Sequence, residues 1–157
     1  MNLLITGGCG FIGSNFIEMV LQSKREFVSK VVNLDALTYA GSLDNTREFE
    51  DDEKYFFEQV NLRNQSQVSE VFKKHNITHV VHLAAESHVD NSIEDPSEFI
   101  QSNVVGTFNL LKLSKEAGVK RFHHVSTDEV YGELGEDGKF NESTPYNPHN
   151  PYSASKA

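Results

Sequence analysis

Residues 3–13 read Leu3-Leu4-Ile5-Thr6-Gly7-Gly8-Cys9-Gly10-Phe11-Ile12-Gly13, and this stretch decides the fold. A short apolar run ends in glycines at Gly7, Gly10 and Gly13, and a segment with helical spacing follows, which predicts a buried strand, a tight turn and a helix. Glycine lets the backbone turn sharply and approach a ligand closely, and the free N–H groups of the new helix can hold a pyrophosphate. A plain turn would also explain the glycines alone, so a dinucleotide site needs support from elsewhere in the chain.

An aspartate stands where a dinucleotide site needs a carboxylate. The apolar run 30–34 predicts a second buried strand that ends at Asp35, 22 residues after Gly13. At about 20 residues a carboxylate can meet the adenosine ribose hydroxyls, although an ordinary loop aspartate would also fit. No basic residue follows in 36–39 to hold a 2′-phosphate, so the sequence favours NAD over NADP.

Strand and helix patterns alternate along the rest of the chain. We expect further strands at 2–6, 55–60, 78–83 and 120–125. The expected helices are 11–23, with Ile12, Phe16, Met19 and Val20 inward, 65–75, with Val68, Val71 and Phe72 inward, and 99–117. The alternation predicts an α/β fold, a doubly wound parallel sheet of order 3-2-1-4-5. Its ligand site is expected at the carboxyl ends of the strands, near the switch between the first and fourth strands.

Composition bounds the class of protein. The 157 residues predict one domain, and the formal net charge of −9 argues against a nucleic-acid or anionic-membrane partner. The single Cys9 excludes an intramolecular disulfide framework, and with no signal peptide or long apolar run we expect a cytoplasmic protein. The seven histidines show no metal-site spacing, since His79 and His82 fall on opposite faces of a strand.

Two further patterns could carry chemistry. Tyr152 and Lys156 are four residues apart, on one face of a predicted helix, where a nearby ammonium would favour the phenolate of a tyrosine acting as a base. Thr127-Asp128-Glu129 follows the fifth predicted strand and offers two carboxyls for acid and base work, or a solvated acidic turn. The long irregular stretch 126–151 between them is typical of a functional loop.

Five segments spread over nearly the whole chain carry a resemblance to a known family. They are 6–14 (TGGCGFIGS), 35–41 (DALTYAG), 82–90 (HLAAESHVD), 126–132 (STDEVYG) and 152–156 (YSASK). Together they resemble the extended short-chain dehydrogenase/reductase family and, within it, the dTDP-glucose 4,6-dehydratases. The pair Asp128-Glu129 discriminates, because the similar sugar-nucleotide 4-epimerases usually carry small residues there.

The resemblance implies NAD as the cofactor and a nucleotide sugar as the substrate. The implied cofactor contacts are Gly7, Gly10, Phe11, Ile12, Gly13, Asp35, Ala36, Leu37, Thr38, Asn61, Leu62, Leu83, Ala84, Ala85, Ser87, Ser102, Tyr152 and Lys156. The implied substrate contacts are Ser87, His88 and Thr127. The family commonly has Lys where this chain has Ala36 and Asp where it has Asn61, and both changes lie at the edge of the cofactor site.

The resemblance also implies catalytic roles for five residues. Tyr152 takes the proton of the sugar 4-hydroxyl while hydride passes from C4 to NAD, and Lys156 holds the nicotinamide ribose and tunes the phenol. Thr127 hydrogen-bonds the sugar, Glu129 removes the C5 proton, and Asp128 protonates the departing C6 hydroxyl before hydride returns to C6. The implied enzyme is a lyase that makes dTDP-4-keto-6-deoxyglucose in nucleotide-sugar and surface-polysaccharide precursor synthesis, such as the dTDP-rhamnose pathway.

The extent of the resemblance sets the expected domain organisation. We expect 1–157 to be an NAD-binding Rossmann domain that includes an active-site loop at 126–151, truncated before a carboxyl-terminal sugar-nucleotide domain. The parent is then a homodimer and this chain is inactive alone. The alternatives are an NAD-binding module without turnover, or a related UDP- or CDP-sugar dehydratase or 4-epimerase.

Overall fold

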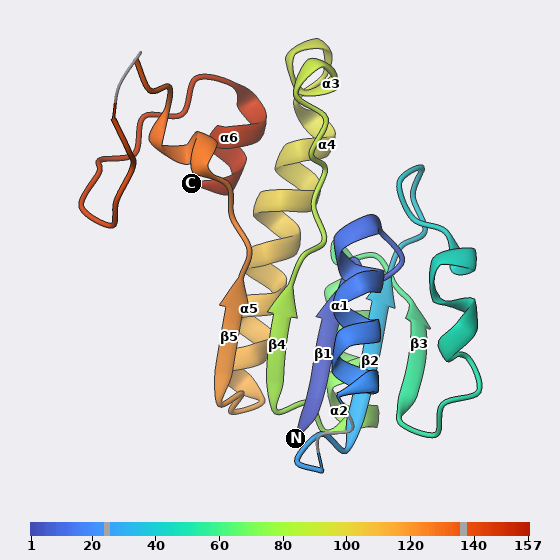
Figure 1. The fold of residues 1–157 in the computed structure, drawn as a ribbon. Coiled ribbons are helices and arrows are strands. Elements are labelled where there is room, and N and C mark those ends of the chain that lie inside the picture. Colours follow the sequence, from blue (N-terminus) through green and yellow to red (C-terminus); the bar gives the residue numbers. More distant parts are fainter. Residues whose placement is uncertain (24–25, 136–137) are drawn as a thin grey trace. The chain divides into compact units, whose positions relative to one another are not determined.

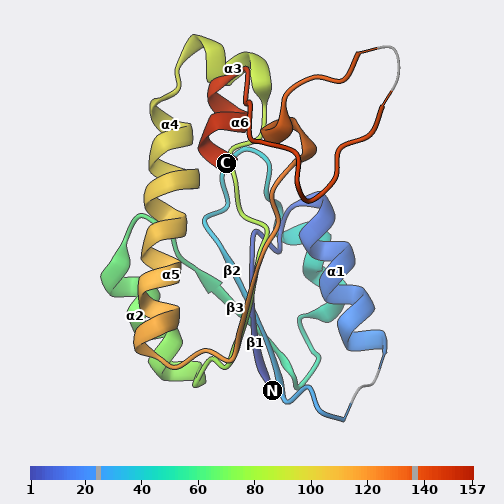
Figure 2. The same ribbon diagram turned by 90° about the vertical axis from the view of Figure 1, so that its left-hand side faces the viewer.

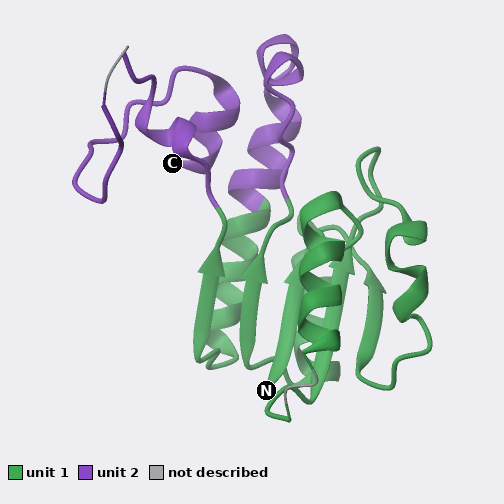
Figure 3. Ribbon diagram, in the orientation of Figure 1, with its two compact units in different colours: residues 1–84, 106–125 green, residues 85–105, 126–157 purple. Residues whose placement is uncertain are grey.

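The computed structural model describes residues 1–23, 26–135 and 138–157 (Figure 1). The chain forms two compact units, each built from two separate stretches of sequence (Figure 3). The first unit holds residues 1–84 and 106–125, and the second holds residues 85–105 and 126–157. Residues 136 and 137 of the expected loop 126–151 lie outside the described part.

The first unit is a parallel sheet with helices on both faces. Its strands are β1 (Asn2–Thr6), β2 (Lys30–Asp35), β3 (Tyr55–Gln59), β4 (His79–His82) and β5 (Arg121–His124), in the order β3-β2-β1-β4-β5. All neighbouring strands run parallel, which confirms the predicted doubly wound order. Figure 2 shows α1 (Phe11–Gln22) on one face of the sheet and α2 (Gln65–His75) with α5 (Thr107–Glu116) on the other.

Two apolar clusters hold these layers together, one on each face of the sheet. Successive side chains of β1 point to opposite faces, so Leu4 joins one cluster while Leu3 and Ile5 join the other. The first cluster includes the predicted inner face of α2, which is Val68, Val71 and Phe72. The second includes Ile17 of α1 and Phe49 of the 3₁₀ helix η1 (Leu43–Phe49).

The predicted inner face of α1 is confirmed for Phe16 and Val20, which pack against the second cluster, and wrong for Ile12 and Met19. Ile12 and Met19 are 63% and 58% exposed, whereas Gly13, Ser14 and Ile17 are buried. The helix begins so close to the glycine turn that small residues must face it, because a Cβ at Gly13 would lie 2.1 Å from the Gly7 carbonyl oxygen. Bulky side chains are therefore excluded from the first turn of the inner face.

The second unit contains short helical segments. They are α3 (Val89–Glu94), α4 (Ser97–Phe99), the π-helix η2 (Ile100–Gly106), the 3₁₀ helix η3 (Asp128–Tyr131) and α6 (Pro151–Lys156). The helix expected at 99–117 is confirmed as an unbroken helical stretch over 97–116, whose middle part η2 is π-helical between α4 and α5 (Thr107–Glu116), and α3 was not anticipated. A π-helical turn adds a residue to the helical repeat, and apolar spacing of 3.6 residues does not reveal it.

Candidate functional site

The glycine turn follows β1 in the first unit. Gly7 has a φ of +72°, and a Cβ there would lie 2.8 Å from the Ala84 Cα. A Cβ at Gly10 would meet only the Gly7 carbonyl oxygen, at 3.4 Å, among the described residues. Gly7 therefore serves close packing of the backbone, whereas Gly10 borders open space of the kind a phosphate would need.

Helix α1 begins directly at this open space. Gly10 is its N-cap and provides no side-chain cap, so the first N–H groups of the helix have no partner from that residue. Phe11 and Ile12 are 83% and 63% exposed, which leaves the first turn accessible. Despite the acidic chain, the turn offers an anion local N–H donors and the positive end of a helix dipole.

Asp35 fastens the glycine turn to the end of β2. Its Oδ2 accepts a hydrogen bond from Cys9 N at 2.9 Å, its Oδ1 accepts one from Leu37 N at 2.8 Å, and the residue is 8% exposed. Each carboxylate oxygen keeps a second lone pair, so this arrangement is compatible with a ribose contact. The fastening role was missed from the sequence, which shows a carboxylate but not the backbone N–H groups it faces.

Asn45 and Ser42 hold the turn from its other side. Asn45 Nδ2 and Ser42 N both donate to the Cys9 carbonyl, at 2.8 and 3.1 Å. The Cys9 side chain is fully buried, and burial raises the pKa of its thiol. Cys9 is thus a small spacer in the turn, and the expected mechanism gives its thiol no role.

A buried polar chain fixes the segment that follows β4. Thr6 Oγ1 accepts from Leu83 N and Ala84 N at 3.2 Å each, and it lies 2.7 Å from His82 Nδ1. Because both acceptor positions of the hydroxyl are used, its proton points to Nδ1, and His82 Nε2–H donates to Thr107 Oγ1 at 2.9 Å. Thr6 and His82 are polar residues inside otherwise apolar strands, and this was the signal in the sequence for the hydrogen-bonded network.

The remaining predicted cofactor contacts of the first unit follow the carboxyl ends of β2 and β3. Ala36 and Leu37 are half-buried and Thr38 is exposed. Asn61 is half-buried, but Leu62 is 7% exposed and packs in the core, and its carbonyl accepts a hydrogen bond from Asn109 Nδ2 at 2.9 Å.

The second unit brings Tyr152 together with the predicted carboxylates. Burial raises the pKa of Tyr152 most, the charges of Glu129 and Asp128 raise it further, and a hydrogen bond with Thr127 opposes the rise. The expectation that Lys156 favours the phenolate stays a prediction, and the charges of the two carboxylates act in the opposite direction. Lys156 is 7% exposed, and burial lowers the pKa of its ammonium to about 8.

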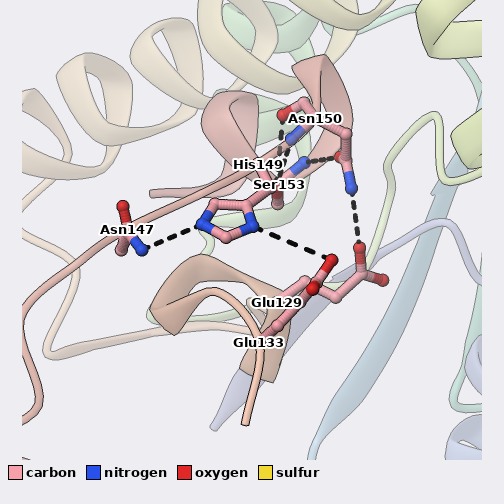
Figure 4. Close-up of polar contacts among 6 residues, drawn as sticks. All are labelled: Glu129, Glu133, Asn147, His149, Asn150 and Ser153. Carbon is pink, nitrogen blue, oxygen red and sulfur yellow. Dashed lines mark hydrogen bonds and ion pairs between the residues drawn. The ribbon is translucent and has the colours of Figure 1, made fainter. Parts of the chain in front are cut away.

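Asparagines missed from the sequence order this unit. Asn103 on η2 donates from Nδ2 to the Glu86 carbonyl at 2.9 Å and to Ser155 Oγ at 2.8 Å, and its Oδ1 accepts from Glu86 N at 2.9 Å. Asn150, the N-cap of α6, donates to Glu129 Oε2 at 3.1 Å (Figure 4). Polar side chains that bond backbone groups recur with no periodicity, so the sequence does not reveal Asn103. Asn150 did have a signal, because an asparagine directly before a proline is typical of a helix N-cap.

The other predicted residues of the second unit are mostly accessible. Ala85 and Ser102 are half-buried, Ser87 and Asp128 are exposed, and His88 is the exposed N-cap of α3. Among the residues described, no three His, Cys, Asp or Glu side chains group to hold a metal ion. No helix in the described ranges is long and apolar enough to span a bilayer.

Comparison with known proteins places this geometry in a family. A family model described as GDP-mannose 4,6 dehydratase matches residues 4–157. The chain belongs to the GDP-mannose 4,6-dehydratase family. It is similar to the dTDP-glucose 4,6-dehydratase of Neisseria gonorrhoeae, with 48% identity over 99% of this chain and 47% of that relative. The Escherichia coli dTDP-glucose 4,6-dehydratase is 41% identical over 100% of this chain and 48% of its own length.

Solved structures agree with this family membership. The dTDP-glucose 4,6-dehydratase of Streptomyces venezuelae, crystallised with NAD, matches with a TM-score of 0.93 and 42% identity, over 99% of this chain and 48% of that one. The UDP-glucose 4-epimerase of Thermus thermophilus in complex with NAD matches with a TM-score of 0.87 and 36% identity, over 99% and 47%. This family member thus spans about half the length of the relatives it matches.

Proposed function

We propose that the chain is the NAD-binding part of a dTDP-glucose 4,6-dehydratase, which converts dTDP-glucose to dTDP-4-keto-6-deoxyglucose and water. One observation carries the proposal: η3, which holds Asp128 and Glu129, packs against the helix α6 that carries Tyr152, and Asn150 at the start of α6 donates to Glu129. Elimination of water needs an acid and a base in addition to the base that serves oxidation. The names of the similar proteins from Neisseria gonorrhoeae and Streptomyces venezuelae support the same reaction.

The glycine turn supports NAD as the cofactor. The open space at Gly10 and the accessible start of α1 fit a pyrophosphate, and Asp35 without a basic neighbour fits an unphosphorylated ribose. When bound, NAD would supply the acceptor for the hydride of C4 and the donor of that hydride to C6. We assign the further contacts to the predicted residues Phe11, Ile12, Gly13, Ala36, Leu37, Thr38, Asn61, Leu62, Leu83, Ala84, Ala85, Ser87 and Ser102.

Five side chains would move or hold protons in this reaction. Tyr152 accepts the proton of the 4-hydroxyl, with the Thr127 hydroxyl beside it, and Lys156 holds the nicotinamide ribose. The resulting C4 ketone makes the C5–H acidic, so Glu129 can remove that proton. Asp128, which is exposed, gives its proton to the C6 oxygen as the C6–O bond breaks and water leaves.

A 4-epimerase is the second candidate, because the Thermus thermophilus UDP-glucose 4-epimerase shares the fold at 36% identity. Epimerisation needs only oxidation and re-reduction at C4, so it gives no work to Asp128 and Glu129. A third reading is a module that binds NAD without turnover. The homodimer, the cytoplasmic location and the dTDP-rhamnose pathway stay predictions.

Two substitutions in the full-length parent test the dehydratase reading. Asp128→Asn removes the acid, so elimination should slow by about 10²–10⁴-fold while C4 oxidation survives and the absorbance of the reduced cofactor accumulates in a single turnover. Tyr152→Phe removes the base and should suppress that first rise in absorbance.

The reverse pattern contradicts the assignment of roles. If Asp128→Asn abolishes the absorbance rise and Tyr152→Phe spares it, the two residues have been exchanged. If neither substitution changes product formation, or if the product is the 4-epimer, the dehydratase reading fails.

A further inference from the structure

Asn150 joins the carboxylate pair to the helix that carries Tyr152 (Figure 4). Its Nδ2 donates to Glu129 Oε2 at 3.1 Å, and its Oδ1 accepts from Ser153 N at 2.7 Å. A backbone N–H only donates, so the amide oxygen must face Ser153 and the amino group must face the carboxylate. The contact with Glu129 therefore requires the amino group of the Asn150 side chain.

Capping of α6 does not account for both contacts. The capping box of α6 pairs Asn150 with Ser153, and Ser, Thr or Asp at position 150 would satisfy it equally well. None of these three residues carries an amino group that could reach Glu129. Asparagine is thus the residue type that caps this helix and also donates to the neighbouring carboxylate.

The adjacent polar contacts do not replace Asn150. Asn147 Nδ2 lies 2.9 Å from His149 Nε2, and His149 Nδ1 lies 3.7 Å from Glu133 Oε1 (Figure 4). His149 thus lies beside a different carboxylate, that of Glu133, and Asn147 contacts His149. Among the residues described, Asn150 is the side chain that donates to the carboxylate of Glu129.

We propose that Asn150 is a positioning residue, which orients the Glu129 carboxylate toward the C5 proton while it caps α6. The proposal rests on the proposed function, in which Glu129 is the base. An unrestrained glutamate rotates about three side-chain torsions. A hydrogen bond that holds its carboxylate lowers the entropy cost of aligning the base during the reaction. Asn150 also ties the start of the Tyr152 helix to the element that holds the carboxylates, so the two sets of catalytic groups keep one arrangement.

Asn150→Ser in the full-length parent separates positioning from capping. Serine keeps the cap but its hydroxyl is too short to reach Glu129, so we expect about tenfold slower elimination with C4 oxidation unchanged in a single turnover. Asn150→Asp also keeps the cap but sets a like charge against Glu129, so its elimination step should slow by more than that of Asn150→Ser. Asn147→Ser is the matched control, and neither step should change.

Two kinetic outcomes overturn the proposal. Unchanged elimination in Asn150→Ser would show that the contact with Glu129 does not matter. An equal loss in oxidation and elimination would show that Asn150 acts only through the helix and Tyr152.

A readout that needs no turnover comes from the 157-residue chain itself. The NMR order parameter of the Glu129 side-chain methylenes should fall in Asn150→Ser and stay unchanged in Asn147→Ser. Equal order in the wild type and Asn150→Ser overturns the proposal. A fall in order together with a parent that makes no 4-keto product would support the orienting contact and reject the proposed function.

Discussion

At the scale of single residues, neighbouring glycines in one motif have different physical duties. A Cβ at Gly13 would lie 2.1 Å from the Gly7 carbonyl oxygen, whereas one at Gly10 has a single neighbour at 3.4 Å. Gly10 also has a φ of −83°, which any residue can adopt. The fold therefore requires glycine at position 13, whereas at position 10 it leaves room for a side chain, and there the proposed pyrophosphate site is what would require glycine.

Gly10→Val should remove NAD binding and leave the chain folded, because its side chain would occupy the space proposed for the pyrophosphate. Gly13→Ala should instead lower the free energy of unfolding by roughly 1–3 kcal/mol or prevent folding, through the clash with the turn. Calorimetry with NAD and thermal unfolding distinguish the two. Unchanged NAD affinity in Gly10→Val would count against the site.

The buried ammonium of Lys156 predicts a pH dependence of stability. Its pKa is about 8 in the folded chain against 10.5 for an ordinary lysine, so between these values the unfolded chain holds a proton that the folded chain lacks. Stability contributed through this group must therefore rise with pH across that window. In urea unfolding, the free energy of unfolding of the wild type relative to Lys156→Met should increase from about pH 8 to about pH 10. Lys112→Met, at an exposed position, is the control and should show no such increase. A constant difference would contradict the burial of the charge.

At the scale of elements, the sequence predicts what repeats and misses what does not. The strand order and the inner face of α2 follow from apolar periodicity, since Val68, Val71 and Phe72 recur at helical spacing. The inner face of α1 was predicted only in part: Phe16 and Val20 pack against the core, but close approach to the turn selects small residues such as Gly13 and Ser14, which hydrophobicity does not reveal. The carboxylates and Tyr152 stand out as motifs, whereas the contacts of Asn103 with Glu86 and Ser155 and of Asn150 with Glu129 leave no pattern in the sequence.

Asn103→Leu tests the largest of these omissions. The substitution keeps the branched shape of a side chain that is 3% exposed but leaves the N–H and C=O of Glu86 without their partner. Each unpaired buried group costs about 1–3 kcal/mol, so the second unit should open more easily. Hydrogen exchange at the Glu86 amide should accelerate, with Gln101→Leu, an exposed position on the same helix, as the control. Unaltered exchange at Glu86 would show that the segment is held by other contacts.

At the scale of the whole molecule, binding and turnover should separate. The described residues include every predicted NAD contact, but the chain spans about half the length of its relatives. We expect the 157-residue chain to bind NAD in preference to NADP by calorimetry and to form no 4-keto sugar from dTDP-glucose. Equal or tighter binding of NADP contradicts the role given to Asp35, and product formation by this chain contradicts its expected inactivity.

The division into two units has a consequence for recombination. The chain passes between them at 84/85, 105/106 and 125/126, so neither unit is encoded by one contiguous block. A crossover at a single point that transplants the carboxylates and Tyr152 with all of their own scaffold must also carry α5 and β5 of the first unit, since Asn103 and Glu86 lie in the earlier stretch. Exchange of the chemistry between homologous genes must carry 85–105 and 126–157 together, and the sheet strand β5 between them can be left behind.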